Sequence, residues 1–224
     1  EPNKLERPMG IALDDKRHAY VVDAGLRRVM VFDGLGLFSH SIDIDRGFTS
    51  PVALAVSPNG DTVYVVDRGD IANEDHKIVA FGQDGKERFR LGPRGPEPGK
   101  FNIPLAAVTG PDGALYVCDS GNFRVQKFDS SGKFLMSFGG VGAELGRFSR
   151  PRSIALDPQG NIYVSDAGFG NVQIFNPQGE LLLAIGKLGQ VSGPGNYRLI
   201  AGIAVDEGGR LYVGDHFVKK VEVF

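Results

Sequence analysis

The tetrapeptide Tyr20-Val-Val-Asp23 is the first of five copies that decide the fold of this chain. The other four are Tyr64-Val-Val-Asp67, Tyr116-Val-Cys-Asp119, Tyr163-Val-Ser-Asp166 and Tyr212-Val-Gly-Asp215. Successive aspartates are 44, 52, 47 and 49 residues apart. A period of some tens of residues is typical of repeat architectures, in which each repeat is one supersecondary unit. The chain is therefore predicted to contain five such units.

Each repeat is predicted to contain four short strands. In the fourth repeat these are Ser153-Ile-Ala-Leu156, the Tyr-Val-x-Asp copy, Asn171-Val-Gln-Ile-Phe175 and Leu181-Leu-Leu-Ala-Ile185. Small and large residues alternate along the first strand, which matches the two-residue period of a β-strand. This alternation suits a sheet that is packed on both faces. Such sheets can be arranged radially as the blades of a propeller.

The repeating cycle of Gly-rich turn, aromatic residue, Pro, small-apolar strand and Tyr-Val-x-Asp resembles the NHL repeat of bacterial type. The best copies are Gly146-Arg-Phe-Ser-Arg-Pro-Arg-Ser-Ile-Ala-Leu-Asp157 and Asp119-Ser-Gly-Asn-Phe-Arg-Val-Gln-Lys-Phe128. The resemblance implies an all-β fold, a β-propeller of four-stranded blades. It favours six blades, of which this chain would cover about five, and a five-bladed propeller is the alternative.

The repeats are expected to form a single propeller domain over residues 1–224. Their approximate bounds are 7–48, 49–101, 102–148, 149–197 and an incomplete 198–224. The fifth repeat stops before a fourth strand, so an unclosed sheet edge is expected, with its risk of aggregation.

Charge and composition narrow the class of partner. The formal net charge is −2 and the isoelectric point is about 6.1. Nucleic-acid binding usually shows as a basic excess, so DNA is excluded and RNA is disfavoured. The single cysteine, Cys118, has no partner for an intramolecular disulfide. No apolar run approaches the roughly 18 residues of a membrane span, and a leader removed before Glu1 would be compatible with export.

The five repeated aspartates could be taken for a ring of carboxylates that binds a cation. A structural role is favoured, because aspartates at turns accept hydrogen bonds from nearby backbone N–H groups. A cation, Arg28, Arg124 or Lys220, also follows five residues after three of them. The predicted structural set is Asp23, Asp67, Asp119, Asp166 and Asp215.

Function is better sought where the repeats differ. The loops after the aspartates carry apolar and cationic residues, the composition expected of a protein interface. The alternative is that each phenylalanine folds back over its own blade. The candidate binding residues are Leu26, Arg68, Asn122, Phe123, Phe169, His216 and Phe217.

A metal centre is the main alternative. Propeller lyases that resemble NHL repeats, the peptidyl-hydroxyglycine amidating lyases, use zinc held by histidines. A zinc site needs about three converging ligands, whereas His216 is the one histidine expected to face the centre. A calcium-dependent lactonase would need Glu, Asn and Asp on the axis, and Glu207 and Glu222 are not placed there. No catalytic residue, metal or cofactor is therefore assigned, with Ca or Zn as the alternative.

The sequence thus predicts a non-catalytic propeller that serves as a protein-binding or assembly module. Its partner would be another protein or an assembly of the cell envelope, and the resemblance suggests an exported protein. A propeller lyase or hydrolase with a divalent metal in the central channel is the first alternative. An RNA-binding NHL domain is the second.

Overall fold

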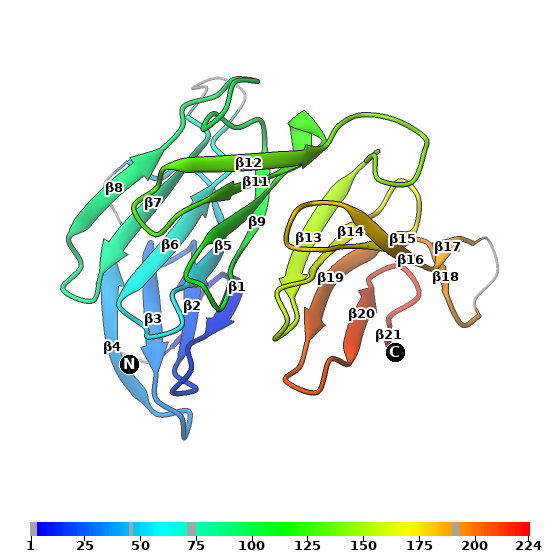
Figure 1. The fold of residues 1–224 in the computed structure, drawn as a ribbon. Coiled ribbons are helices and arrows are strands. Elements are labelled where there is room, and N and C mark those ends of the chain that lie inside the picture. Colours follow the sequence, from blue (N-terminus) through cyan, green and yellow to red (C-terminus); the bar gives the residue numbers. More distant parts are fainter. Residues whose placement is uncertain (1–3, 45–46, 71–74, 190–192) are drawn as a thin grey trace.

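The computed structural model of the chain describes residues 4–44, 47–70, 75–189 and 193–224. These residues form antiparallel sheets that follow one another along the sequence, and Figure 1 shows the sheets arranged around a common centre. Within the described residues, no helix is long and apolar enough to cross a bilayer.

The first two blades have four strands each. Blade 1 contains β1 (Pro8–Leu13), β2 (Ala19–Asp23), β3 (Arg28–Phe32) and β4 (Phe38–Asp43). Blade 2 contains β5 (Pro51–Val56), β6 (Thr62–Asp67), β7 (Lys77–Gly82) and β8 (Glu87–Leu91). In both blades the spatial order of the strands is their sequence order.

Blades 3 and 4 repeat this meander, and blade 5 has three strands. Blade 3 contains β9 (Pro104–Thr109), β10 (Leu115–Asp119), β11 (Arg124–Phe128) and β12 (Phe134–Gly139), with a 3-10 turn, η1 (Ser120–Asn122). Blade 4 contains β13 (Pro151–Leu156), β14 (Ile162–Asp166), β15 (Asn171–Phe175) and β16 (Leu181–Ile185). Blade 5 contains β19 (Ile200–Val205), β20 (Leu211–Asp215) and β21 (Lys220–Val223). A short parallel pair, β17 (Lys187–Leu188) with β18 (Asn196–Tyr197), lies between blades 4 and 5.

The first strand of each blade is the inner strand of the propeller. Strands β1, β5, β9, β13 and β19 pack on one another in that order. At one end of these strands is a cleft of about 370 Å³ whose lining comes from all five blades, including Leu13, Val56, Thr109, Leu156 and Val205. The structure thus shows a β-propeller arrangement of five blades. The five-bladed alternative describes it, and the six-bladed count is not confirmed.

Aliphatic side chains fill the space between neighbouring blades. Between blades 1 and 2, Val29 and Val31 of β3 meet Val63 and Val65 of β6 in one core, and each of the four is at most 2% exposed. Burying one such side chain contributes roughly 1.5–3 kcal/mol relative to leaving it in water. In blades 2 to 4, the alternation seen in the sequence is therefore the alternation between two faces of a sheet, each of which packs on a neighbouring blade.

A buried aromatic residue precedes each inner strand from the second blade onward. The residues are Phe48, Phe101, Phe148 and Tyr197, and the last three have no exposed surface. The Phe148 ring contacts the Phe175 ring of the same blade, with centroids 5.7 Å apart. These rings fill the core beneath the chain that connects one blade to the next.

Replacing Phe148 by alanine should lower the free energy of unfolding by about 3–5 kcal/mol, because the ring is fully buried and its removal leaves a cavity. The matched control is Leu145→Ala, since Leu145 is 61% exposed in the same connection. Urea denaturation followed by circular dichroism measures both. Equal losses for the two variants would show that the Phe148 ring does not hold the connection.

Candidate functional site

The five repeated aspartates lie where the second strand of each blade ends, and each is at most 2% exposed. The Asp23 carboxylate accepts backbone N–H groups of Glu6 and Arg7 at 2.6 and 3.0 Å, before the inner strand. It also accepts those of Gly25 and Leu26 at 2.9 and 3.0 Å, in the turn after it. Burial raises the pKa of Asp23, but these bonds outweigh it and the pKa lies below its ordinary value. The carboxylate thus ties two segments of backbone together.

Three other aspartates make the same connection. Asp67, Asp166 and Asp215 each accept the backbone N–H groups of the two residues that precede the inner strand of their blade. Asp67 also accepts one N–H group from the turn that follows it, and Asp166 and Asp215 each accept two. Carboxylates whose lone pairs are occupied in this way leave little capacity for a cation.

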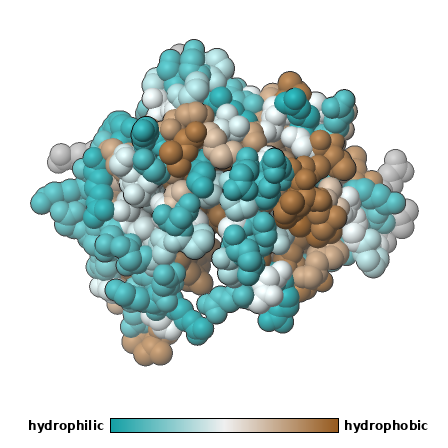
Figure 2. Space-filling model, in the orientation of Figure 1, coloured by the Kyte–Doolittle hydropathy of each residue, from teal (hydrophilic) through white to brown (hydrophobic). Residues whose placement is uncertain are grey.

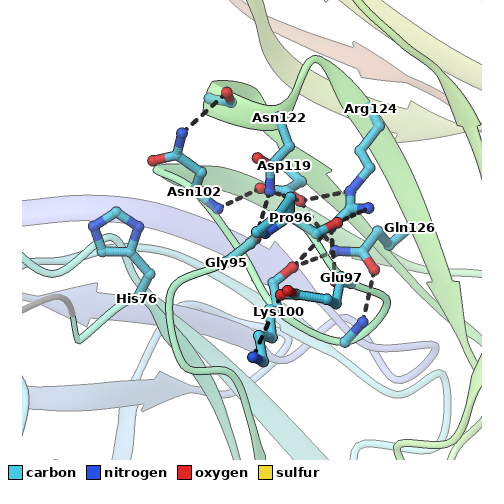
Figure 3. Close-up of polar contacts among 12 residues, drawn as sticks. His76, Gly95, Pro96, Glu97, Lys100, Asn102, Asp119, Asn122, Arg124 and Gln126 are labelled. Carbon is cyan, nitrogen blue, oxygen red and sulfur yellow. Dashed lines mark hydrogen bonds and ion pairs between the residues drawn. The ribbon is translucent and has the colours of Figure 1, made fainter.

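Asp119 in blade 3 departs from this pattern. It accepts one N–H from the connection, that of Asn102 at 2.7 Å. Its other donors are side chains: Asn122 Nδ2 at 2.8 Å, Arg124 Nε at 2.8 Å and Gln126 Nε2 at 3.0 Å (Figure 3). Burial raises the pKa of Asp119 despite these bonds.

Arg124 also holds the connection between blades 2 and 3. Its two terminal nitrogens donate to the carbonyl oxygens of Pro96, Glu97 and Lys100 at 2.7–3.0 Å. Figure 3 shows the guanidinium between this loop and Asp119. The loop is therefore fastened to the end of β10 by charged side chains.

The second backbone N–H of this connection, that of Ile103, does not donate to Asp119. It donates to Nδ1 of His76 at 2.8 Å, whereas its counterparts Arg7, Ser50, Arg150 and Leu199 donate to their aspartates. The backbone of Ile103 has φ +52°, in the left-handed region. Among the described residues it is the one β-branched residue with a positive φ. Such a residue is a conformational outlier that costs roughly 1–2 kcal/mol and often marks a functional site.

His76 reaches this position from the insertion that lengthens the second repeat. Its side chain is buried, and burial together with the nearby Arg94 lowers its pKa. A Cβ on Gly69 would lie 2.8 Å from the His76 ring, and a Cβ on Gly92 would lie 2.6 Å from the His76 carbonyl oxygen. The two glycines thus let the backbone and His76 approach each other closely.

A cleft of about 640 Å³ lies beside the His76–Ile103 contact. Ile103, 41% exposed, forms an apolar part of its wall. Arg68 is exposed and its Nε donates to Ser50 Oγ at 3.1 Å, so the guanidinium is held at the mouth. The cleft therefore combines a cation, Arg68, and a carboxylate, Asp70, with hydroxyl groups and an aliphatic side chain. Its lining is Thr49, Ser50, Arg68, Gly69, Asp70, His76 and Ile103.

Comparisons with known proteins bear on the repeat. The model of the NHL repeat matches residues 101–128 and 148–175. NHL repeat-containing protein 3 of Mus musculus is 36% identical over 81 residues, which are 36% of this chain and 22% of that protein. The chain carries NHL repeats. The match spans about a fifth of the mouse protein, and the bacterial type stays a prediction.

Two solved structures share the fold of this NHL propeller. The virginiamycin B lyase of Staphylococcus aureus has a TM-score of 0.68 at 15% identity, over 99% of this chain and 71% of that chain. A chain of a nidogen/laminin complex has a TM-score of 0.71 at 20% identity, over 97% of this chain and 75% of that chain. At these identities the likeness shows the fold alone.

Of the binding residues predicted from the NHL loops, Arg68 lines the cleft. Asn122 instead donates to the Gly95 carbonyl oxygen at 2.9 Å and to Asp119, so it supports the connection. His216 is exposed at the corresponding turn of blade 5. The predicted cation partners also differ, because Arg124 bonds its aspartate whereas Lys220 bonds Glu222 Oε1 at 2.7 Å.

The four apolar loop tips do not form one set. Leu26 and Phe169 are the third residue after their aspartate, Phe123 is the fourth and Phe217 is the second. Leu26, Phe123 and Phe169 are half-buried, and Phe123 packs on the core between blades 3 and 4. Phe217 is 58% exposed, with the Arg198 guanidinium 4.2 Å from its ring centroid. Their role at an interface stays a prediction.

His18 and His40 each interact with a different polar residue. His18 Nδ1 lies 2.8 Å from Asp14 Oδ2, and His40 Nε2 lies 3.1 Å from Gln83 Oε1. Over the part of the chain that the structure describes, no three His, Cys, Asp or Glu side chains are grouped to hold a metal ion.

Replacing Asp119 by alanine should lower the free energy of unfolding by about 3–5 kcal/mol, because it leaves Arg124 half-buried without its anion and several donors unpaired. Asp84→Ala is the control, since that carboxylate is exposed in a turn and should leave stability unchanged. Urea denaturation measures both. A loss below 1 kcal/mol for Asp119→Ala would mean that the connection is held without this ion pair.

Ile103→Asn should raise the free energy of unfolding by about 1 kcal/mol, because asparagine adopts the left-handed conformation more readily than isoleucine. Leu135→Asn, at a 47% exposed position in strand β12, is the matched control and should not stabilise the protein. Thermal unfolding distinguishes them. If the two variants lose stability equally, Ile103 is not strained.

Proposed function

We propose that this NHL propeller binds another protein through the cleft between blades 2 and 3. The observation that carries the proposal is the changed hydrogen bond at Ile103. Its backbone N–H donates to His76, whereas the equivalent N–H groups of the other blades donate to their aspartates. The exchange keeps a strained, partly exposed isoleucine beside the cleft. Strain of this kind persists when the surrounding structure enforces it, and it clusters at sites of recognition.

The chemistry of the cleft fits a protein partner. Arg68 can form paired hydrogen bonds with a carboxylate or a backbone carbonyl, and arginine is common among the residues that dominate interface energies. Ser50 already orients its guanidinium. Ile103 supplies apolar contact next to it, so the site offers the mixed composition of an interface core and rim.

The two solved structures that share this fold belong to proteins with different functions. One is a lyase and the other comes from a nidogen/laminin complex, a complex between proteins. The second supports a binding role for this chain, in which the partner is a protein or an envelope assembly. Export from the cell belongs to the same proposal. A metal-dependent lyase or hydrolase and an RNA-binding domain stay as alternatives.

The proposal is tested by placing a photo-crosslinking amino acid at position 103 and, as a control, at position 145 on the exposed Leu145. Irradiation in extracts of the source cells, followed by mass spectrometry, should give a protein adduct from position 103 that is absent from position 145. With that partner purified, Arg68→Glu should weaken binding by about 2 kcal/mol, near thirtyfold, as for a central interface arginine.

Arg210→Glu is the control, since Arg210 is an exposed arginine that pairs with Asp206 away from the cleft. It should leave the dissociation constant unchanged in calorimetry. Adducts of equal yield from both positions, or one equivalent of tightly held zinc or calcium per chain, would count against a protein-binding cleft.

A further inference from the structure

In four of the five blades a cationic residue stands opposite the repeated aspartate, at the start of the third strand. These pairs are Asp23 with Arg28, Asp67 with Lys77, Asp119 with Arg124 and Asp215 with Lys220. In blade 4 the residue opposite Asp166 is Asn171, which carries no charge. The positive charge of this position is therefore lost in one blade.

In blades 2, 3 and 5 the cation binds backbone carbonyl oxygens of the connection that leads into its own blade. Arg124 does so in blade 3, as Figure 3 shows. In blade 5, Lys220 Nζ donates to the carbonyl oxygens of Gly193 at 2.9 Å and Asn196 at 3.1 Å. Lys77 Nζ donates to one carbonyl oxygen of the connection into blade 2. The connection thus provides a cluster of carbonyl oxygens for one positive charge.

The connection into blade 4 has the same hydrogen bonds as the connection into blade 3. Arg147 N–H donates to the Glu144 carbonyl oxygen at 3.0 Å. The Gln173 side chain accepts Gly146 N–H at 2.7 Å and donates to the Arg147 carbonyl oxygen at 2.8 Å. The three equivalent bonds in blade 3 measure 3.0, 3.0 and 2.8 Å. The carbonyl oxygens of Glu144 and Arg147 therefore correspond to those that bind a cation in blades 3 and 5.

Within the described residues, no side chain takes the place of this cation in blade 4. Arg147 belongs to the same connection, but its guanidinium is exposed and donates to the Gly139 carbonyl oxygen at 2.6 Å. The neighbouring strand β16, Leu181–Ile185, is entirely apolar, and Figure 2 shows it as a hydrophobic patch on the surface. A carbonyl oxygen has two lone pairs, so the oxygens of this connection keep capacity for a further partner.

Asn171 adds a buried oxygen to the same place. The residue is 7% exposed, and its Oδ1 is buried without a hydrogen-bond donor among the described residues. Buried polar atoms in native proteins usually have a partner, which can be a protein group, an ordered water or an ion. One electropositive partner would satisfy this amide oxygen and the carbonyl oxygens of the connection together.

We propose that a monovalent cation of about the size of an ammonium group, such as potassium, binds between Asn171 and the connection into blade 4. Its ligands are Asn171 Oδ1 and the carbonyl oxygens of Glu144 and Arg147, and water completes the shell. The bound ion supplies the positive charge that Lys220 supplies in blade 5.

The donor set favours a monovalent ion over a divalent one. Backbone carbonyl oxygens can replace the hydration shell of potassium, whereas calcium sites in proteins usually include several carboxylates. The buried Asp166 carboxylate contributes negative charge beside the site, and its oxygens already accept four backbone N–H groups. The groups that fill the equivalent place in blades 2, 3 and 5 also carry one positive charge each.

The experiment unfolds the 224-residue chain in urea at equal ionic strength in potassium chloride, choline chloride or calcium chloride, with circular dichroism as the readout. In potassium chloride the equilibrium constant for unfolding should be about tenfold lower than in choline chloride, as for a ligand present at about ten times its dissociation constant. Calcium chloride should give the result of choline chloride. Stabilisation by calcium beyond that by potassium overturns the assignment of a monovalent ion.

Asn171→Lys places an ammonium group at the site covalently. This variant should be at least as stable in choline chloride as the unchanged chain is in potassium chloride, and the two salts should then differ by less than about twofold. The matched control is Gln178→Lys, which adds the same charge at an exposed turn of the same blade and should keep the tenfold response. Asn171→Ala, which removes the amide oxygen, should lose most of the response.

An equal response of the unchanged chain and Asn171→Lys would overturn the proposal, because it would show a general effect of salt. Crystals of the unchanged chain grown in rubidium chloride give a second measurement that depends on no variant. Anomalous scattering should place a rubidium ion in contact with Asn171 Oδ1. A map without an ion at that position overturns the proposal in favour of an ordered water.

Discussion

The hydrogen bonds of the turn aspartates are the interactions on which this propeller depends. In four of the five blades, one carboxylate joins the backbone before the inner strand to the turn after the second strand. These N–H groups lie between strands, so neither a helix nor a sheet ladder satisfies them. A buried charge that meets three or four backbone donors costs less than an unpaired one. The carboxylates thus set how one blade follows another.

Blade 3 keeps the connection and changes the groups that make it. Arg124, Asn122 and Gln126 replace backbone donors at Asp119, and His76 receives the N–H that this leaves over. The Ile103 N–H is thus not bonded to the aspartate, as its counterparts in the other four blades are, and Ile103 adopts a strained conformation beside Arg68. A local difference in hydrogen bonding is therefore coupled to the shape of the neighbouring cleft.

The period of the Tyr-Val-x-Asp copies was enough to predict the strands, the blades and the two-faced packing, because these follow from local pattern. The same copies predicted five repeats, and the structure has five blades. The count of six that the family resemblance favoured is not confirmed, because closure of a propeller depends on contacts beyond one repeat. Arg68, which lines the cleft, was selected from the sequence because the residue after the aspartate differs between repeats, and its binding role stays a prediction. Ile103 was missed because its sequence context, before Pro104, resembles that of Arg7 before Pro8. Its backbone angle depends on His76, which belongs to another blade.

The order of packing also has a consequence for how the molecule comes apart. Each inner strand packs on its sequence neighbours, so stability is distributed as in a linear array with coupling between adjacent units. Among the described residues, the inner strands of blades 2, 3 and 4 each pack on two neighbouring inner strands, whereas those of blades 1 and 5 each pack closely on one. Local opening should therefore begin at the two terminal blades, with amide hydrogen exchange slowest in the middle three. His76 and Ile103 join two of those middle blades, where cooperative support is greatest and a strained backbone is best tolerated.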